Sequence, residues 1–95
     1  MEKIITIQKA LPTTERAYTD KNGQPQVFTS RGFVLSDGID TFYAEMQGDL
    51  ARVNAHTAYD TGTTYSVQLQ LSLRTYTDSQ GTERYVNEAR IMKMG

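Results

Sequence analysis

The residues best suited to chemistry in this sequence are aromatic rings and positively charged side chains that lie near one another. Tyr18 and Lys21 are close neighbours in the N-terminal part, and Arg74, Tyr76 and Arg84 are grouped near the other end. An aromatic ring can stack on a nucleic-acid base, and a guanidinium or ammonium group can contact phosphate. Each residue alone also has an ordinary interpretation, because strand aromatics often pack in a core and surface cations are often only solvated.

Groups that perform catalysis are sparse. The sequence has one histidine, His56, and no cysteine, so neither a disulfide framework nor a metal site of the usual ligand spacing is expected. Carboxylates such as Asp37, Asp40 and Glu45 lie near expected turns, where solvated acids are far more common than a general acid–base pair. No serine stands in a nucleophile-elbow motif. We therefore expect no enzymatic activity, no metal and no cofactor.

Length and charge set further limits. A chain of 95 residues fits one domain, residues 1–95, with a single small core. The formal net charge of −1 argues against a protein held to duplex DNA mainly by a basic surface. No apolar run approaches a membrane span, and no signal-peptide segment is recognisable at the N-terminus. The absence of cysteine makes the cytoplasm the simplest location to expect.

The elements that would position these side chains are predicted to be β-strands. The expected strands are Glu2–Leu11, Gln26–Ser36, Ile39–Gln47, Tyr65–Arg74 and Arg84–Met92. Pro12 should end or kink the first strand because proline donates no ladder hydrogen bond, although Thr13–Tyr18 could continue in extended form. Turn-forming residues separate the strands at 20–25, 36–38, 60–63 and 78–81.

Alternation along the strands indicates which side chains point into a core. In the fourth strand the apolar face consists of Val67, Leu69, Leu71 and Leu73, which the period of two places together. In the second strand, inward Phe33 and Leu35 would turn Phe28 outward, unless a bulge at Gly32 reverses that phase. Tyr43 has the same two interpretations as Phe28, core or outer face, whereas we expect Tyr85 in the core.

One short helix is expected between the third and fourth strands. Residues 49–56 contain helix formers, and Leu50 and Val53 stand three apart, which is helical spacing. Gly48 or Asp49 would cap a helix of about two turns. His56 would then lie at its end as a surface residue.

The last hairpin carries a resemblance to a known family. The segment 73–88 is similar to the hairpin that joins the fourth and fifth strands in bacterial single-stranded-DNA-binding proteins. The matching positions are Leu73, Arg74, Tyr76, Asp78, Gly81, Arg84, Tyr85 and Glu88. The segment after Thr75 is one residue shorter than in that family. Those proteins usually carry an acidic C-terminal tail that recruits partners, and this sequence ends at Gly95 without one, so we do not carry that role over.

The resemblance implies the OB-fold, and the order of elements agrees with it. Three strands, a short helix and two strands is the order of a five-stranded OB-fold barrel. We therefore predict an all-β fold of this kind, with an open five-stranded sandwich as the structural alternative.

In such a barrel the usual binding groove crosses the second and third strands, flanked by the first and last hairpin loops. The residues expected to converge there are Tyr18, Lys21, Phe28, Arg31, Tyr43, Arg74, Tyr76, Arg84 and, as a further phosphate contact, Arg90. The predicted function is non-sequence-specific binding of single-stranded DNA, with RNA as the variant ligand, by a homo-oligomer. The alternative is a protein-interaction or assembly module on the same fold, which the near-neutral charge favours.

Overall fold

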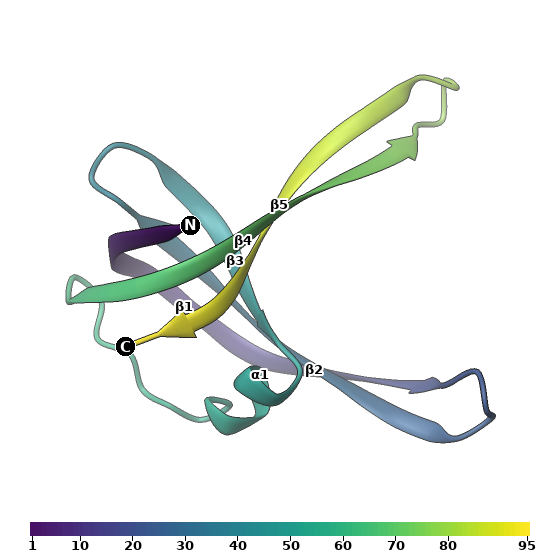
Figure 1. The fold of residues 1–95 in the computed structure, drawn as a ribbon, viewed down its shortest axis with the longest axis horizontal. Coiled ribbons are helices and arrows are strands. Elements are labelled where there is room, and N and C mark those ends of the chain that lie inside the picture. Colours follow the sequence, from purple (N-terminus) through teal and green to yellow (C-terminus); the bar gives the residue numbers. More distant parts are fainter.

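The computed structural model describes residues 1–95 as five strands and one helix. The elements are β1 (Glu2–Thr19), β2 (Pro25–Ser36), β3 (Thr41–Gln47), α1 (Asp49–Val53), β4 (Thr64–Thr77) and β5 (Glu83–Met94). The strands close into a barrel in the order β1-β2-β3-β5-β4, and α1 lies between β3 and β4 in the chain (Figure 1). This is the predicted architecture, and the open sandwich is wrong.

Barrel closure is uneven around the circumference. β1 pairs antiparallel with β2 on one side and with β4 on the other, and β4 pairs with β5 over most of its length. β3 and β5, in contrast, run parallel and meet at one bridge, between Glu45 and Arg90. The barrel wall is therefore continuous except where β3 and β5 diverge on either side of that bridge.

The core is small and comes from every strand. Its buried apolar residues are Ile5, Ile7, Phe33, Leu35, Ala44, Met46, Ala51, Val67, Leu69 and Ile91. Phe33 and Leu35 point inward as the alternation of β2 predicts. Ala51 of α1 is fully buried and Leu50 packs against the core beside it, so the helix covers one end of the barrel.

The first strand does not end at Pro12. β1 continues to Thr19, and its pairing with β2 shifts register between Ala10 and Thr13. Because proline cannot donate to the ladder, the irregularity falls at the residue that would break the pattern. The kink and the continued extension are thus confirmed, and the end of the strand at Leu11 is wrong.

Gly32 does not interrupt the second strand. It pairs with Glu45 within an unbroken β2–β3 register, so the phase of β2 stays the same on both sides of it. The reversed-phase alternative is therefore wrong, and Phe28 lies on the outer face with Ser30 and Gly32. Gly32 is required for a different reason, a close approach by Tyr43 that is described below.

Two hairpin arms extend beyond the barrel on the same side (Figure 1). The β1–β2 arm ends in the turn at 20–24, and the β4–β5 arm ends in the turn at 78–82. Leu71 and Leu73 are on the β4–β5 arm and are 55% and 62% exposed, so their predicted place in the core is wrong. The alternation of β4 continues past the end of the barrel, where no second layer covers its apolar face.

Tyr85 belongs to the same uncovered surface. It lies on β5 opposite Thr75, on the face of the arm that also carries Leu71 and Leu73, and is 63% exposed. The expectation that Tyr85 packs in the core is therefore wrong for the same reason. The alternation along the strand predicted the correct face for Tyr85, but the β4–β5 hairpin extends beyond the end of the barrel.

The helix is shorter than expected. α1 ends at Val53, and the Asn54 amide Nδ2 donates a 2.9 Å hydrogen bond to the Leu50 carbonyl. The backbone N–H of Asn54 donates to the same carbonyl at 3.2 Å, so Asn54 caps the C-terminal end of the helix with both its backbone and its side chain. His56 is exposed, as expected. With five residues, α1 is far too short to span a membrane.

Candidate functional site

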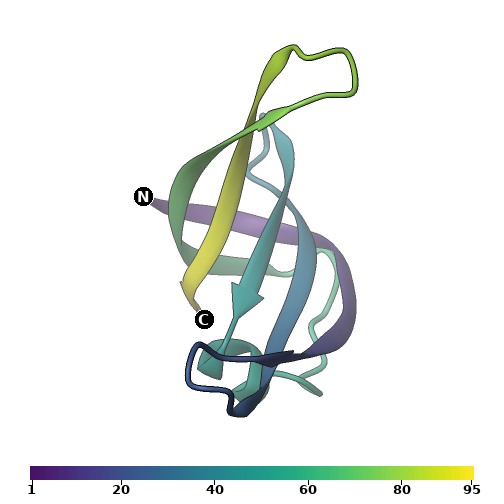
Figure 2. The ribbon, with the colours of Figure 1, turned by 90° about the vertical axis from the view of Figure 1, so that its right-hand side faces the viewer.

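A groove runs between the two arms, across the outer face of the barrel. In Figure 2 the molecule is turned so that the side carrying both arms faces the viewer, with β2, β3 and β5 between them. The groove has a volume of about 1160 Å³, and β1, β2, β3, β4 and β5 all contribute to its lining. Its apolar lining residues include Phe42 of β3, Leu71 of β4 and Ala89 of β5.

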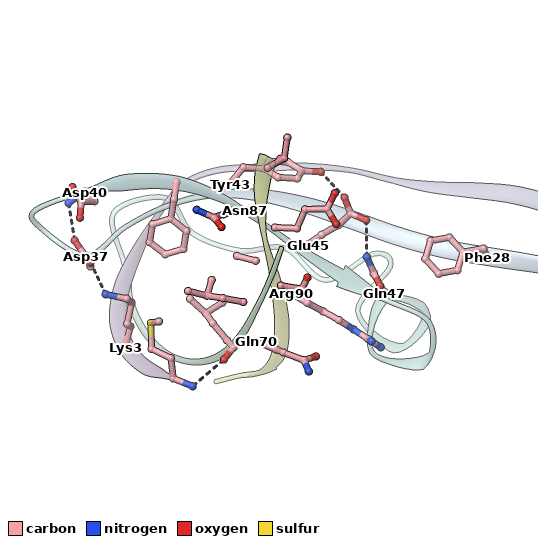
Figure 3. Close-up of a pocket in the computed structure, with 18 of the residues that line it drawn as sticks. Lys3, Phe28, Asp37, Asp40, Tyr43, Glu45, Gln47, Gln70, Asn87 and Arg90 are labelled. Atoms are coloured by element: carbon pink, nitrogen blue, oxygen red, sulfur yellow. Dashed lines mark hydrogen bonds and ion pairs between the residues drawn. The ribbon is translucent and has the colours of Figure 1, made fainter. Parts of the chain in front are cut away.

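Tyr43 is the most exposed ring on the floor of this groove. Its side chain projects from the outer face of β3 and is 52% exposed. The hydroxyl donates a 2.9 Å hydrogen bond to Oε2 of Glu45, as Figure 3 shows. Partial burial, followed by the bond to the Glu45 carboxylate, raises the pKa of Tyr43 above its usual value. The ring is therefore neutral and held in one orientation before any ligand arrives.

Gly32 provides the space in which this ring lies. A Cβ at Gly32 would stand 2.3 Å from Oη of Tyr43 and 2.7 Å from its Cε2. No side chain larger than hydrogen fits there while the ring keeps its place. Gly32 thus leaves the space that the ring of Tyr43 occupies, and Glu45 holds the hydroxyl end of that ring by a hydrogen bond.

A second ring, Phe28, lies further along the groove. It pairs across the β1–β2 ladder with Arg16, and the Arg16 guanidinium carbon is 5.6 Å from the centre of the ring. This is within the range of a cation–π contact. Arg16 has no carboxylate partner, so its charge remains available to a ligand. Phe28 and Arg16 together place a stacking surface beside a phosphate-binding group.

The centre of the floor combines charged and amide side chains. Glu45 and Arg90 face each other across the single β3–β5 bridge, yet they form no ion pair. Instead the Glu45 carboxylate accepts from Tyr43 and, at 3.4 Å, from the Gln47 amide. Arg90 makes no side-chain hydrogen bond at all. It is a free cation in the lining of the groove (Figure 3).

At one end of the groove a lysine is already neutralised. Nζ of Lys3 lies 2.9 Å from Oδ2 of Asp37. Hydrogen bonds from the backbone N–H of Asp40 and from Lys3 hold the pKa of Asp37 well below its usual value. The lining contains the cations Lys3, Arg16 and Arg90 and the carboxylates Asp37, Asp40, Glu45 and Glu88. The groove therefore carries no net positive charge, and Arg16 and Arg90 are its cationic side chains without an ion-pair partner.

Three predicted residues share one face of the β4–β5 arm but do not line the groove. Tyr76 pairs with Arg84 across the ladder, and the guanidinium carbon of Arg74 is 5.8 Å from the centre of the Tyr76 ring. Arg74 is 2.6 Å from Oε1 of Glu88, and Arg84 is 2.9 Å from Oδ2 of Asp78. The hydrogen bond from Arg84 lowers the pKa of Asp78. Both arginines thus have carboxylate partners on the arm itself.

Arg31 is not on the groove surface, which corrects the expectation that it contacts phosphate. Its side chain points to the closed end of the barrel, and the residue is 9% exposed. The guanidinium donates to the backbone carbonyls of Leu11 (3.1 Å), Asn54 (2.7 Å) and Thr57 (2.8 Å). The inward phase of β2 explains this, because Arg31 alternates with Gly32 and points the same way as Phe33. Through these hydrogen bonds, Arg31 connects the segment after α1 to the irregular part of β1 near Pro12.

Tyr18 and Lys21 lie near the tip of the β1–β2 arm. Tyr18 is nearly half exposed, and Lys21 is exposed in the turn with no ion-pair partner. The Asp20 carboxylate organises this turn by accepting from the backbone N–H groups of Asn22 and Gln24, and the bond from Gln24 is the main reason that its pKa is lowered. Neither predicted residue reaches the groove floor, so any contact they make would be at its edge.

Sequence reasoning missed Arg16 and the central place of Glu45. Arg16 becomes a groove residue because it stands opposite Phe28, and that partnership depends on a register set after the Pro12 irregularity. Glu45 was treated as one of several turn-proximal carboxylates. Its alternation with Ala44 and Met46 was the available signal, since it places Glu45 on the same outer face as Tyr43.

Comparisons with known proteins identify the fold. The chain is similar to the second OB-fold domain of replication protein A from Methanococcus maripaludis, with a TM-score of 0.58 and 16% sequence identity. The match covers 99% of this chain and 79% of that one. No family model and no curated protein matches the sequence. The likeness establishes the OB-fold for this chain, and at this identity it establishes the fold alone.

Proposed function

We propose that the protein binds single-stranded nucleic acid along the groove between its two arms. The observation that carries the proposal is the lining of that groove, which combines two rings, Tyr43 and Phe28, with two arginines that have no ion-pair partner, Arg90 and Arg16. Rings stack successive bases and cations meet the phosphates between them. The OB-fold supports the proposal because its groove is a frequent site for oligonucleotides, although the fold by itself fixes no function.

Stacking should supply the larger share of affinity. Each stacked base contributes about 1–3 kcal/mol, whichever base it is. The groove has few free cations, so the number of released counterions is small and the salt dependence should be shallow. We therefore propose binding that tolerates many sequences, with single-stranded DNA as the ligand and RNA as the variant to be tested beside it.

The β4–β5 arm extends this site in our proposal. Arg74, Tyr76 and Arg84 would contact a strand that leaves the groove, and Tyr18 and Lys21 would contact it at the other arm. Arg74 and Arg84 must exchange their carboxylate partners for phosphate, so they should contribute less than Arg90. Longer oligonucleotides should reveal these contacts, since one OB-fold typically covers about 4–16 nucleotides.

Fluorescence anisotropy with a labelled mixed-sequence strand of about 15 nucleotides tests the proposal. Binding at ~10 mM salt, where charges are least screened, should weaken in Tyr43→Ala and Phe28→Ala without unfolding. The same strand annealed to its complement is the matched control and should bind more weakly, because paired bases cannot stack on the rings. A folded protein that leaves the single strand unbound would contradict the proposal.

The second candidate is a protein-interaction module, and the uncovered face of the β4–β5 arm favours it. Leu71, Leu73 and Tyr85 form an exposed apolar surface on an arm that nothing else in the chain supports. We propose that the protein is a homo-oligomer in either case, with the exposed polar positions Gln68, Gln70 and Ser72 available to pair across a two-fold axis. Sedimentation velocity over a range of concentrations tests this, and a 10.7 kDa species at every concentration would contradict it.

A further inference from the structure

Glu45 poses an electrostatic question for a groove that holds a polyanion. Its carboxylate lies at the centre of the floor, beside the stacking ring, and no cation neutralises it within ion-pair distance. Its hydrogen-bond donors are the Tyr43 hydroxyl and the Gln47 amide, both uncharged. A phosphate close to this position would be repelled, so a strand should place a base or a sugar, and not a phosphate, over Glu45.

The geometry also indicates which part of a base would meet the carboxylate. Glu45 holds the hydroxyl end of Tyr43 at 2.9 Å, so it lies at the outer edge of the ring on which a base would stack. A base on that ring presents its own edge, with its exocyclic groups, to the carboxylate. An ionised carboxylate has two oxygens with about four acceptor sites, and Tyr43 and Gln47 use two of them. Acceptor capacity therefore remains for a donor on the base.

The bases differ in what they can donate there. Cytosine carries an amino group at position 4, which Glu and Asp side chains accept from in known base recognition. Thymine has a carbonyl oxygen at that position, and its single ring N–H is flanked by two carbonyl oxygens that repel a carboxylate. Adenine and guanine carry amino groups as cytosine does. A carboxylate at this point of the groove should thus discriminate against thymine.

We propose that Glu45 is a specificity-determining residue that biases the groove toward bases with an exocyclic amino group, and against thymine and uracil. This inference rests on the proposed binding function and adds a preference to it at one position. Stacking on Tyr43 and Phe28 still accepts every base, so the result is a composition bias and not a sequence code. The contact is charge-assisted, the stronger class of hydrogen bond in proteins.

The test compares oligo-dC with oligo-dT of equal length, about 15 nucleotides, at one salt concentration. The two pyrimidines have six-membered rings and equal backbone charge, so their affinity ratio reports on the base edge together with the 5-methyl group of thymine, and oligo-dU, which lacks that methyl group, separates the two effects. Mildly alkaline buffer keeps cytosine N3 unprotonated and the dC strand unfolded. The wild-type protein should bind oligo-dC about tenfold more tightly, within the range of one good base contact.

Glu45→Gln should remove the preference. The amide oxygen can still accept from the Tyr43 hydroxyl, so the ring stays in place, but the negative charge is lost and an N–H donor that suits thymine is gained. The ratio should fall to about one or invert. Glu88→Gln is the matched control, because Glu88 lines the same groove and its partner is Arg74. That variant should change both affinities equally and leave the ratio as in the wild type.

A ligand-side measurement makes the test independent of any variant. N4,N4-dimethylcytosine keeps the cytosine ring but has no amino hydrogen, so a strand of it should bind no better than oligo-dT. A wild-type ratio of one or less, a ratio that persists in Glu45→Gln, or full binding of the dimethylated strand would overturn the inference while leaving the binding function intact. Failure of both oligonucleotides to bind would instead remove the proposed function itself.

Discussion

Replacing Gly32 by alanine should disable Tyr43 without altering Tyr43 itself. The added Cβ would stand 2.3 Å from the hydroxyl oxygen of Tyr43 and 2.7 and 2.8 Å from two of its ring carbons. These separations are well inside van der Waals contact, so the ring must leave its position. The backbone at Gly32 is not in the left-handed region, so alanine causes no strain in the strand itself.

The cost to stability should be small because two effects oppose each other. Alanine in a strand interior is favoured over glycine by roughly 0.5–1 kcal/mol. The displaced ring gives up its hydrogen bond to Glu45, which contributes about 0.5–1.5 kcal/mol. Tyr43 is already half exposed, so moving it outward leaves no cavity in the core. We expect the free energy of unfolding to change by less than about 1 kcal/mol.

The cost to binding should be much larger. If Tyr43 stacks a base, Gly32→Ala should lose about 1–3 kcal/mol of oligonucleotide affinity, the value of one stacked base. Fluorescence anisotropy measures this loss, and thermal melting by circular dichroism checks that the variant is folded. The slope of log K against log salt should stay unchanged, because no phosphate contact is removed.

A double-mutant cycle with Tyr43→Ala provides the control. Both single variants should weaken binding to a similar degree, and Gly32→Ala should add almost nothing in the Tyr43→Ala background, since the ring is already absent. Wild-type affinity in a folded Gly32→Ala variant would refute the role of the fixed ring. Strictly additive losses would also refute it, because they would show that Gly32 acts on binding by another route.

Three further outcomes follow from the structure. Arg90→Gln should flatten the slope of log K against log salt by about 0.7, the value for one single-strand phosphate contact, whereas Arg84→Gln should flatten it less because Arg84 already has a carboxylate partner; anisotropy titrations in a salt series compare the two. The pKa values of Asp37 and Asp78 are lowered in the folded state, so the stability that these carboxylates contribute should be complete above about pH 5 and decline as the pH falls below about 4. Melting temperatures measured from about pH 5 downward should therefore decline less steeply when either residue is changed to Asn. A pH profile that does not change in the variants would count against their role. Arg31→Ala should cost on the order of 3 kcal/mol in urea unfolding because three carbonyl oxygens lose their donor, and a cost near zero would show that water replaces the guanidinium.

The fold was predictable from sequence because its signals are local. The alternation of apolar and polar residues predicted the strands, and turn-forming residues predicted where the strands end. Pro12 marked the irregularity in β1. What alternation could not supply was the length of the barrel relative to its hairpins. Leu73 and Tyr85 show this limit, since they follow the inward phase but lie on the arm, where no other part of the chain covers them.

The site was predictable only in part, because it depends on partners that are distant in sequence. Tyr43 and Arg90 were identified from residue type, and their place on the groove depends on the barrel order. Arg31 has the same chemistry as Arg90 and was assigned the same role, but strand phase sends it inward to backbone carbonyls. Arg16 gains its role only through its pairing with Phe28. Residue type indicates what a side chain can do, and register decides where it does so.

The single bridge between β3 and β5 has a consequence for how the molecule moves. Every other seam of the barrel is a ladder of successive pairs, whereas this one holds at Glu45 and Arg90 alone. Local opening occurs first where a structure has the fewest supporting hydrogen bonds, so the barrel should open between β3 and β5 at a lower free-energy cost than at its other strand pairs. Backbone amides that border this seam should exchange with solvent sooner than those of the β1–β2 ladder. The β3–β5 seam also runs through the groove floor, so a nucleic-acid strand bound across β3 and β5 would connect the two strand edges and reduce this local opening.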